Sequence, residues 1–244
     1  MYNHLCIDND FGWFVGNLHN NQTHKHYAIQ LCLPLHDQIV LNTNKGIIKT
    51  DRSILIASNI PHQIISNTQH FVLLINPAST IGHFWKSISK DSIQELDYQP
   101  VISELKSNLL SPTFSIKKLN NIIKKYDCFC NSAIHAGDER INTSLIFLSK
   151  NYDRIVSLEE MADYCALSPS RFLHLFKQQT GVTFRRAQLW FKVRHAVSLF
   201  DKKSITEIAH EVGFSDSGHL SRTFKENFGF SPREFIKFSQ FIQV

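Results

Sequence analysis

Hydrophobic residues in the first third of the chain recur with a period close to two. The runs are short and rich in β-branched residues, as in residues 39–41, 53–57 and 70–75. Asn, Asp, Gly and Pro separate the runs at intervals of roughly ten residues, which is the spacing of strands joined by turns. The pattern from residue 23 to residue 75 therefore predicts a small β-sandwich or β-barrel.

After these strands the pattern changes to that of amphipathic helices. One stretch covers residues 93–109 and is interrupted at Pro100, where the helix is expected to break. A second stretch begins at Ser115, a good N-cap, and carries an apolar stripe over residues 116–123 with lysines on its other faces. The stripe, which includes Leu119, is expected either to pack on the strands or to form a contact between two subunits.

One pattern appears twice in the C-terminal part of the chain, over residues 157–181 and again over residues 204–229. In each copy a Ser starts a short helix, and a second Ser precedes a longer one. Ala162 and Ala209 are small enough to let the two helices of a copy cross closely. Each copy closes with a Phe-Lys pair and a Gly four residues later. Two such copies predict two helix-turn-helix units.

The turn inside each unit calls for a residue with a positive φ. Gly213 supplies it in the second copy, whereas Ala166 stands at the matching place in the first copy and is strained if that position is left-handed. Ser168 and Ser215 are the expected N-caps of the longer helices, and Pro169 fits a first helical turn. A connecting helix is expected over residues 184–200.

The spacing of apolar residues divides each longer helix into two faces. Phe172 and Phe176, and likewise Leu220 and Phe224, are four residues apart and should face the core of their own unit. The residues on the opposite faces are the candidates for contacts with base edges, and basic residues nearby are the candidates for phosphate contacts. The first set is Ser170, Arg171, His174, Ser217, His219 and Arg222, and the second is Lys177, Arg185, Arg186 and Lys225.

The second copy is the most specific stretch. Residues 208–217, followed by residues 220–225 and 229–232, resemble the AraC/XylS family of bacterial transcription regulators. The resemblance implies seven helices with both recognition helices in successive segments of the major groove of promoter or operator DNA. It also implies RNA polymerase as a partner and a homodimer.

The resemblance suggests a chain of α and β structure in two domains. Residues 1–80 look like a cupin-like sensor barrel, followed by helices for dimerisation or packing over residues 81–130. A linker over residues 131–140 leads to an all-α double helix-turn-helix domain over residues 141–244.

Net charge supports the placement of DNA binding. The chain has 26 Lys and Arg against 21 Asp and Glu, and from Arg140 onward it has 15 against 10, so the whole excess of +5 lies there. Residues 1–16 contain no Lys or Arg, which argues against a signal peptide. The sequence contains no run of 18 apolar residues, so no membrane span is expected. The expected location is the cytoplasm, without a membrane partner.

Histidines offer the candidate chemistry of the N-terminal part. His24 and His26 point to one face of a strand and could share an ion with His62. An acidic residue to complete the ligand set is not in place, and Gln30 is a poor ligand, so the sequence assigns no metal and no cofactor. The alternatives are ordinary structural histidines and a pocket for a small-molecule effector, and the residues assigned to that pocket are His24, His26, His62, Tyr27 and Trp13.

These features together predict a sequence-specific DNA-binding transcription regulator, an activator or a repressor, with an N-terminal sensor and dimerisation barrel. A regulator whose barrel is blind to ligands and which is controlled only by its abundance is a further possibility. The sequence has no Ser-His-Asp ordering, P-loop or Rossmann glycine pattern, so no enzyme activity is expected. The alternative from another class is a cupin-like metalloenzyme fused to a DNA-binding module.

Overall fold

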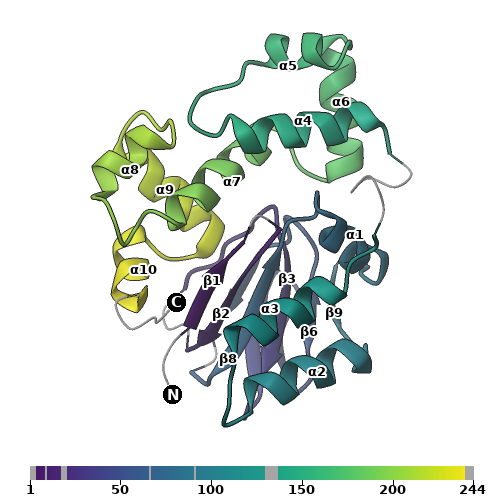
Figure 1. Cartoon of the computed structure of the whole chain (residues 1–244), viewed down its shortest axis with the longest axis vertical. Coiled ribbons are helices and arrows are strands. Elements are labelled where there is room, and N and C mark those ends of the chain that lie inside the picture. The colour runs from purple at the N-terminus through teal and green to yellow at the C-terminus, as the bar shows by residue number, and fades with distance from the viewer. Residues whose placement is uncertain are drawn as a thin grey trace.

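The computed structural model describes residues 4–8, 10–17, 21–65, 67–90, 92–129 and 137–239. Strands and three helices make up the N-terminal domain, and seven helices make up the C-terminal domain of this described part. Figure 1 shows the C-terminal helices lying across one end of the sheets. No helix among the described residues is long and apolar enough to cross a membrane.

The strands form two antiparallel sheets. They are β1 (His4–Ile7), β2 (Phe11–Gly16), β3 (Ile29–Pro34), β4 (Ile39–Thr43), β5 (Gly46–Thr50), β6 (Ile54–Ile56), β7 (His62–Ile64), β8 (His70–Ile75) and β9 (Ile93–Glu95). The larger sheet has the order β1-β2-β8-β3-β6-β9, and the smaller has the order β5-β4-β7.

Three helices cover the outer face of the larger sheet, with α2 and α3 in front of the strands in Figure 1. They are α1 (Thr80–Ser87), α2 (Gln99–Leu109) and α3 (Ile116–Lys125). Alternation along β3 divides the apolar residues between two cores. Leu31 and Leu33 join Leu119 in the core beneath the helices, whereas Cys32 joins Leu41 in the core between the sheets.

The strand runs that the period of two predicts are confirmed in β3, β4, β6 and β8. The two sheets do not close on one another through a continuous ladder, so the predicted cupin-like barrel is not confirmed. Strands β1 and β2 lay outside the predicted pattern. Most of β2 is buried, which removes the alternation that marks a strand with one exposed face.

Two expectations for the segment after β8 are wrong. Pro100 does not break a helix but stands in the first turn of α2, where its missing N–H costs no hydrogen bond. Ile93 is not helical, because β9 pairs with β6 at the edge of the larger sheet, Ile56 opposite Ile93. The 81–130 segment therefore contributes a strand as well as helices.

The C-terminal domain contains the two expected pairs of helices. Its helices are α4 (Glu139–Lys150), α5 (Leu158–Tyr164), α6 (Pro169–Thr180), α7 (Phe184–Val197), α8 (Ile205–Glu211), α9 (Ser217–Phe228) and α10 (Pro232–Ser239). The connecting helix α7 ends at Val197, three residues before the expected end. Asp138 caps α4, and residues 131–136 of the expected linker lie outside the described residues.

Equivalent hydrogen bonds build the turns of the two units. Ala166 has φ 50° and Gly213 has φ 69°, so both turns use the left-handed conformation. The residue after each turn donates its N–H to the carbonyl of Ala162 or of Ala209, at 2.9 and 2.8 Å. A Cβ at Gly213 would lie 2.1 Å from the carbonyl oxygen of Asp153, so only glycine fits there.

The caps also match, with one correction. Ser168 caps α6, as expected, by accepting the N–H of Arg171. The cap of α9 is Asp216 rather than the expected Ser215, and its carboxylate accepts the N–H of His219 at 2.7 Å. Ser215 donates instead to that carboxylate, so it supports the cap from one residue away.

Candidate nucleic-acid interface and interdomain cavity

Helix α6 exposes the predicted base-reading residues of the first unit. Ser170, Arg171 and His174 are exposed, whereas Phe172 and Phe176 are fully buried in the core of the C-terminal domain. The i, i+4 spacing therefore identified the buried face of the helix correctly. The exposed face presents a hydroxyl, a guanidinium and an imidazole, which are groups able to donate to base edges.

Helix α9 repeats this arrangement in the second unit. Leu220 and Phe224 are fully buried, Arg222 is exposed, and Ser217 and His219 are partly exposed. The imidazole of His219 is held in place, with Nδ1 3.3 Å from the Ser215 hydroxyl. Its ring also meets the ring of the buried Phe214 edge-on at 4.9 Å. A side chain that is ordered in this way loses less conformational entropy on binding.

Three of the four predicted phosphate-contacting residues are exposed, namely Lys177, Arg185 and Lys225. Arg186 is partly buried, and its guanidinium donates to the carbonyl oxygen of Lys25 at 2.6 Å. Its burial lowers its pKa from the ordinary value. In this structure Arg186 therefore holds the two domains together.

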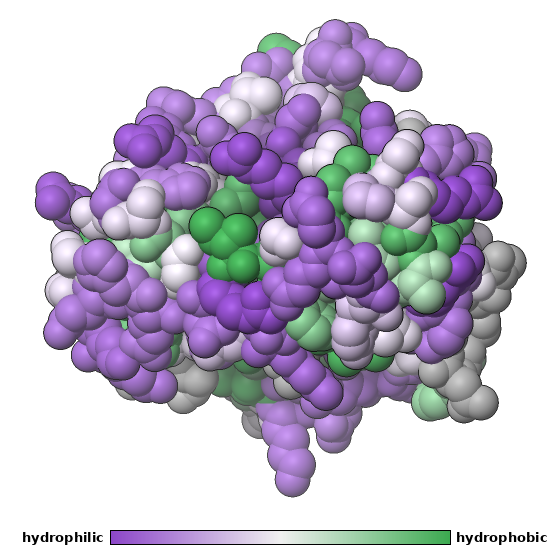
Figure 2. Space-filling model, turned by 90° about the horizontal axis from the view of Figure 1, so that it is seen from above, coloured by the Kyte–Doolittle hydropathy of each residue, from purple (hydrophilic) through white to green (hydrophobic). Residues whose placement is uncertain are grey.

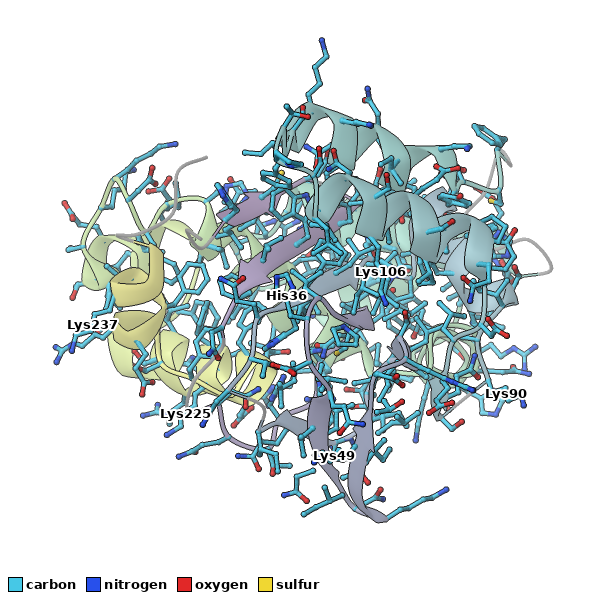
Figure 3. The ribbon with its side chains drawn as sticks, turned by 90° about the horizontal axis from the view of Figure 1, so that it is seen from below. His36, Lys49, Lys90, Lys106, Lys225 and Lys237 are labelled. Carbon is cyan, nitrogen blue, oxygen red and sulfur yellow. The ribbon has the colours of Figure 1, made fainter. Side chains whose placement is uncertain are left out.

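The surface around the helices is mostly polar. Figure 3 shows Lys225 and Lys237 at the outer edge of the C-terminal helices, directed away from the ribbon. Figure 2, from above, shows a largely hydrophilic face with small hydrophobic areas. Ile155, which is 78% exposed, is the most exposed of the large aliphatic residues described.

Lys192 is a structural residue that sequence reasoning missed as such. Its side chain is buried, and Nζ donates to the carbonyl oxygens of Val212 at 3.0 Å and Gly213 at 2.9 Å. Burial lowers the pKa of Lys192 to about 8. The ammonium fixes the turn of the second unit to α7. The only sign in the sequence that Lys192 is buried was its position among the apolar residues of α7.

The two domains meet through backbone hydrogen bonds and aromatic rings. The N–H of Gln22 donates to the carbonyl of Gly229 at 2.6 Å, at the end of α9. Tyr27 belongs to the core of the C-terminal domain, with its ring 6.3 Å from Phe191 and 6.4 Å from Trp190. A segment of the N-terminal domain thus completes the core of the C-terminal helices.

A cavity of about 110 Å³ lies at this contact, well above the space of a single buried water. Strand β2 contributes Phe11 and Trp13, and the C-terminal domain contributes Trp190, Val197 and Phe228. Its lining is mostly apolar, with a few charged groups at its margin, which are Asp8, Asp10 and Arg194.

Only some of the predicted pocket residues line this cavity. Trp13, His24 and His26 line the cavity, but Tyr27 and His62 do not. His62 lies beside the other two histidines, with ring centroids 4.4 Å from His24 and 5.2 Å from His26. The structure thus brings the three histidines together and places Tyr27 in the neighbouring core.

Comparisons with known proteins agree with this geometry. A family model described as "Helix-turn-helix domain" matches residues 161–237. The HTH-type transcriptional activator RhaS of Escherichia fergusonii is 40% identical over 101 residues, which is 40% of this chain and 36% of the relative. RhaS of Citrobacter koseri is 38% identical over the same length. The chain thus spans about a third of the length of these curated relatives.

Solved structures show the fold of nearly the whole chain. An apo ToxT variant from Vibrio cholerae strain SCE256 has a TM-score of 0.64 at 15% identity, covering 95% of this chain and 98% of that one. ToxT from Vibrio cholerae O395 has a TM-score of 0.61 at 16% identity, with the same coverage. The arrangement of an N-terminal α/β domain before a helical domain is therefore shared. The helical domain, with its two helix-turn-helix units, is therefore similar to part of the HTH-type transcriptional activator RhaS.

Proposed function

We propose that the chain is a sequence-specific transcription regulator, of activator type, that reads promoter DNA with α6 and α9. The observation that carries this proposal is the repeated geometry of the two units. Each has the same left-handed turn and a polar face opposite a buried apolar stripe. The matched relatives are named as transcriptional activators, which supports regulation rather than catalysis.

The test is a footprint of the full-length chain on DNA fragments selected from a random pool. Two adjacent helix-turn-helix units should protect two major-groove segments about 10 base pairs apart on one face of the duplex. Binding should also weaken steeply as salt rises, because phosphate contacts release counterions. Selection that yields no sequence preference over random DNA would overturn the proposal.

We also propose that the interdomain cavity binds a small apolar effector. A ligand there would touch both domains, and an apolar lining with a few polar groups suits a small-molecule site. One ToxT structure, with a TM-score of 0.59 at 15% identity to this chain, is of the protein bound to an unsaturated fatty acid. As a transcription regulator, the chain would also have RNA polymerase and a second copy of itself as partners, and it would act in the cytoplasm.

Oleate is a suitable first probe of the cavity. An effector acts only through different affinities for two arrangements of the protein, so it should shift both the melting temperature and DNA affinity. Val197→Phe, which narrows the cavity from α7, should reduce both shifts, whereas Ile155→Phe on the exposed surface should leave them. If oleate and other apolar acids shift neither quantity, the cavity is not an effector site for that class.

A further inference from the structure

Three buried histidines meet at the contact between the domains. One ring nitrogen of each of His24, His26 and His62 lies within 4.8 Å of the others. The residues are 7%, 1% and 0% exposed. A backbone bridge between His24 and His62 brings the segment before β3 beside β7 and holds the cluster together.

The backbone fixes the hydrogen on each ring. Nδ1 lies 2.9 Å from a carbonyl oxygen in His24 and in His26, and 2.8 Å from one in His62. Because a carbonyl oxygen only accepts, Nδ1 carries the hydrogen and Nε2 keeps its lone pair. Neutral imidazole is the form that binds metal ions.

Gln30 adds a further acceptor to the cluster. Its Oε1 lies 2.9 Å from Nε2 of His26 and 3.3 Å from Nε2 of His62, while its Nε2 donates to Sγ of Cys32. Lone pairs therefore face one another without a hydrogen between them. Unpaired acceptors are costly in a buried site, and a cation among them would satisfy them.

We propose that His24, His26 and His62 bind a divalent transition-metal ion of the zinc class, with Gln30 Oε1 beside the fourth coordination position. Zn–N bonds of about 2.0–2.1 Å place ligand nitrogens roughly 3.4 Å apart. The three nitrogens lie within 4.8 Å of one another, so the widest pair must close by up to about 1.4 Å. Three histidines with an open fourth position are an established zinc set, which does not require the missing acidic residue. The cavity that His24, His26 and Gln30 line gives the ion a route to the site.

The site is coupled to the DNA-binding helices, and this part of the inference rests on the proposed function. A Cβ at Gly229, the last residue of the α9 cap, would lie 2.7 Å from Nδ1 of His24. The ring of His26 lies 5.9 Å from Trp190 of α7. An ion that draws the three rings together changes the surface on which α7 and α9 rest. It would therefore bind the two arrangements of the domains with different affinity.

The first experiment measures metal binding by the full-length chain without DNA. The protein is stripped with a chelator, dialysed against Zn²⁺ alone, and analysed for metal content and melting temperature. One Zn²⁺ per chain and a raised melting temperature are expected. Co²⁺ in place of Zn²⁺ should give the visible absorption of a low-symmetry nitrogen site. Wild-type protein that retains no Zn²⁺ and shows no Co²⁺ spectrum overturns the inference.

Variants then assign the ligands. His24→Gln, His26→Gln and His62→Gln should each weaken Zn²⁺ binding by more than about tenfold. Loss of a residue that only hydrogen-bonds to a ligand already weakens metal binding by about tenfold or more, so loss of a ligand should weaken it further. His70→Gln is the matched control, because His70 is also buried with Nδ1 2.8 Å from a carbonyl oxygen but lies outside the cluster. Equal weakening in the control, or none in the three variants, overturns the assignment.

Gln30→Glu separates a metal site from a hydrogen-bonded cluster. A carboxylate is a better ligand than an amide, so Zn²⁺ affinity should rise at least about tenfold. In a metal-free cluster the amide would instead donate to the rings, and the variant would gain no Zn²⁺ affinity. A Gln30→Glu variant without any gain in Zn²⁺ affinity contradicts the proposal, even if the histidine variants fail to fold.

DNA affinity with Zn²⁺ and with chelator tests the coupling. Zn²⁺ should change the affinity for selected DNA, and DNA should change Zn²⁺ affinity by the same factor. Stoichiometric Zn²⁺ with unchanged DNA affinity refutes the coupling and leaves the metal site. Protein that binds Zn²⁺ but no DNA under either condition refutes the proposed function instead.

Discussion

At the scale of single residues, the internal repeat sets up a direct comparison of two turns. Ala166 and Gly213 occupy equivalent left-handed positions, but only the glycine adopts this conformation without strain. Ala166 is exposed, so a smaller residue removes no packing there. At Gly213 the carbonyl of Asp153 fills the space that a side chain would need.

Exchanging the residues at these turns should therefore have opposite effects. Ala166→Gly should raise the free energy of unfolding by roughly 0.5–1 kcal/mol, because it relieves the left-handed strain. Gly213→Ala should lower the free energy by more than that amount, because strain and a clash add together. Urea denaturation of both variants measures the difference, and a stabilised Gly213→Ala would show that the second turn is not constrained as described.

Arg222 is the residue best placed to read a base in the second unit. It is exposed on α9 opposite Leu220 and Phe224. Arg222→Ala should weaken binding to the selected site by roughly 1–3 kcal/mol, the range for a bidentate contact to guanine, and weaken binding to random DNA much less. Arg52→Ala, an exposed arginine of the N-terminal domain, is the control. Equal losses on both DNAs would assign Arg222 to the phosphate backbone.

At the scale of elements, local chemistry decided what the sequence could predict. The Ser caps of α5, α6 and α8 and the apolar spacing of α6 and α9 are properties of a few neighbouring residues, and all were confirmed. The expected Ser cap of α9 was wrong by one residue, because Asp216 caps that helix. Strand β9 was missed because three residues inside a helical period carry no separate signal. The bond from Arg186 to Lys25 joins residues 161 positions apart, so no local pattern reports it.

Lys192 ties two elements of the C-terminal domain together. Lys192→Met should lower the free energy of unfolding by about 1.5–3 kcal/mol, because two buried carbonyl oxygens lose a charged donor. The folded pKa of about 8 lies below the unfolded value of about 10.4, so the unfolded chain holds more protons between these pH values. The stability gap between wild type and variant should therefore widen from pH 8 to pH 10. A gap that narrows with pH contradicts this account.

Leu119 on α3 decides the role of the helices after β8. The structure places Leu119 and Ile123, both fully buried, in the core beneath α1–α3. Leu119→Asp should therefore unfold the N-terminal domain, because it buries a charge without a partner. Near-ultraviolet circular dichroism during thermal melting reports the loss, with Lys118→Asp on the exposed side as control. A folded monomer in place of a dimer would instead place a subunit contact at this stripe.

At the scale of the whole molecule, the N-terminal domain forms part of the environment of the DNA-binding helices. Tyr27 packs into their core, and Gln22 caps the end of α9 through Gly229. A ligand in the interdomain cavity would touch these helices directly, and an ion at the three histidines would act on them through His24 and His26. A regulator of this type needs two arrangements of its domains that differ in DNA affinity.

Variants of Lys225 and Arg186 distinguish a contact with DNA phosphate from a contact between the two domains. Lys225 is exposed, so Lys225→Ala should weaken binding to every sequence and reduce the slope of log affinity against log salt by about 0.9. Arg186 is engaged by Lys25, so Arg186→Ala should leave that slope unchanged and instead alter how strongly the cavity probe shifts DNA affinity. Fluorescence anisotropy over a salt series, with and without oleate, measures both quantities. If Arg186→Ala lowers the slope as Lys225→Ala does, the domain contact must open on DNA and release Arg186 to a phosphate.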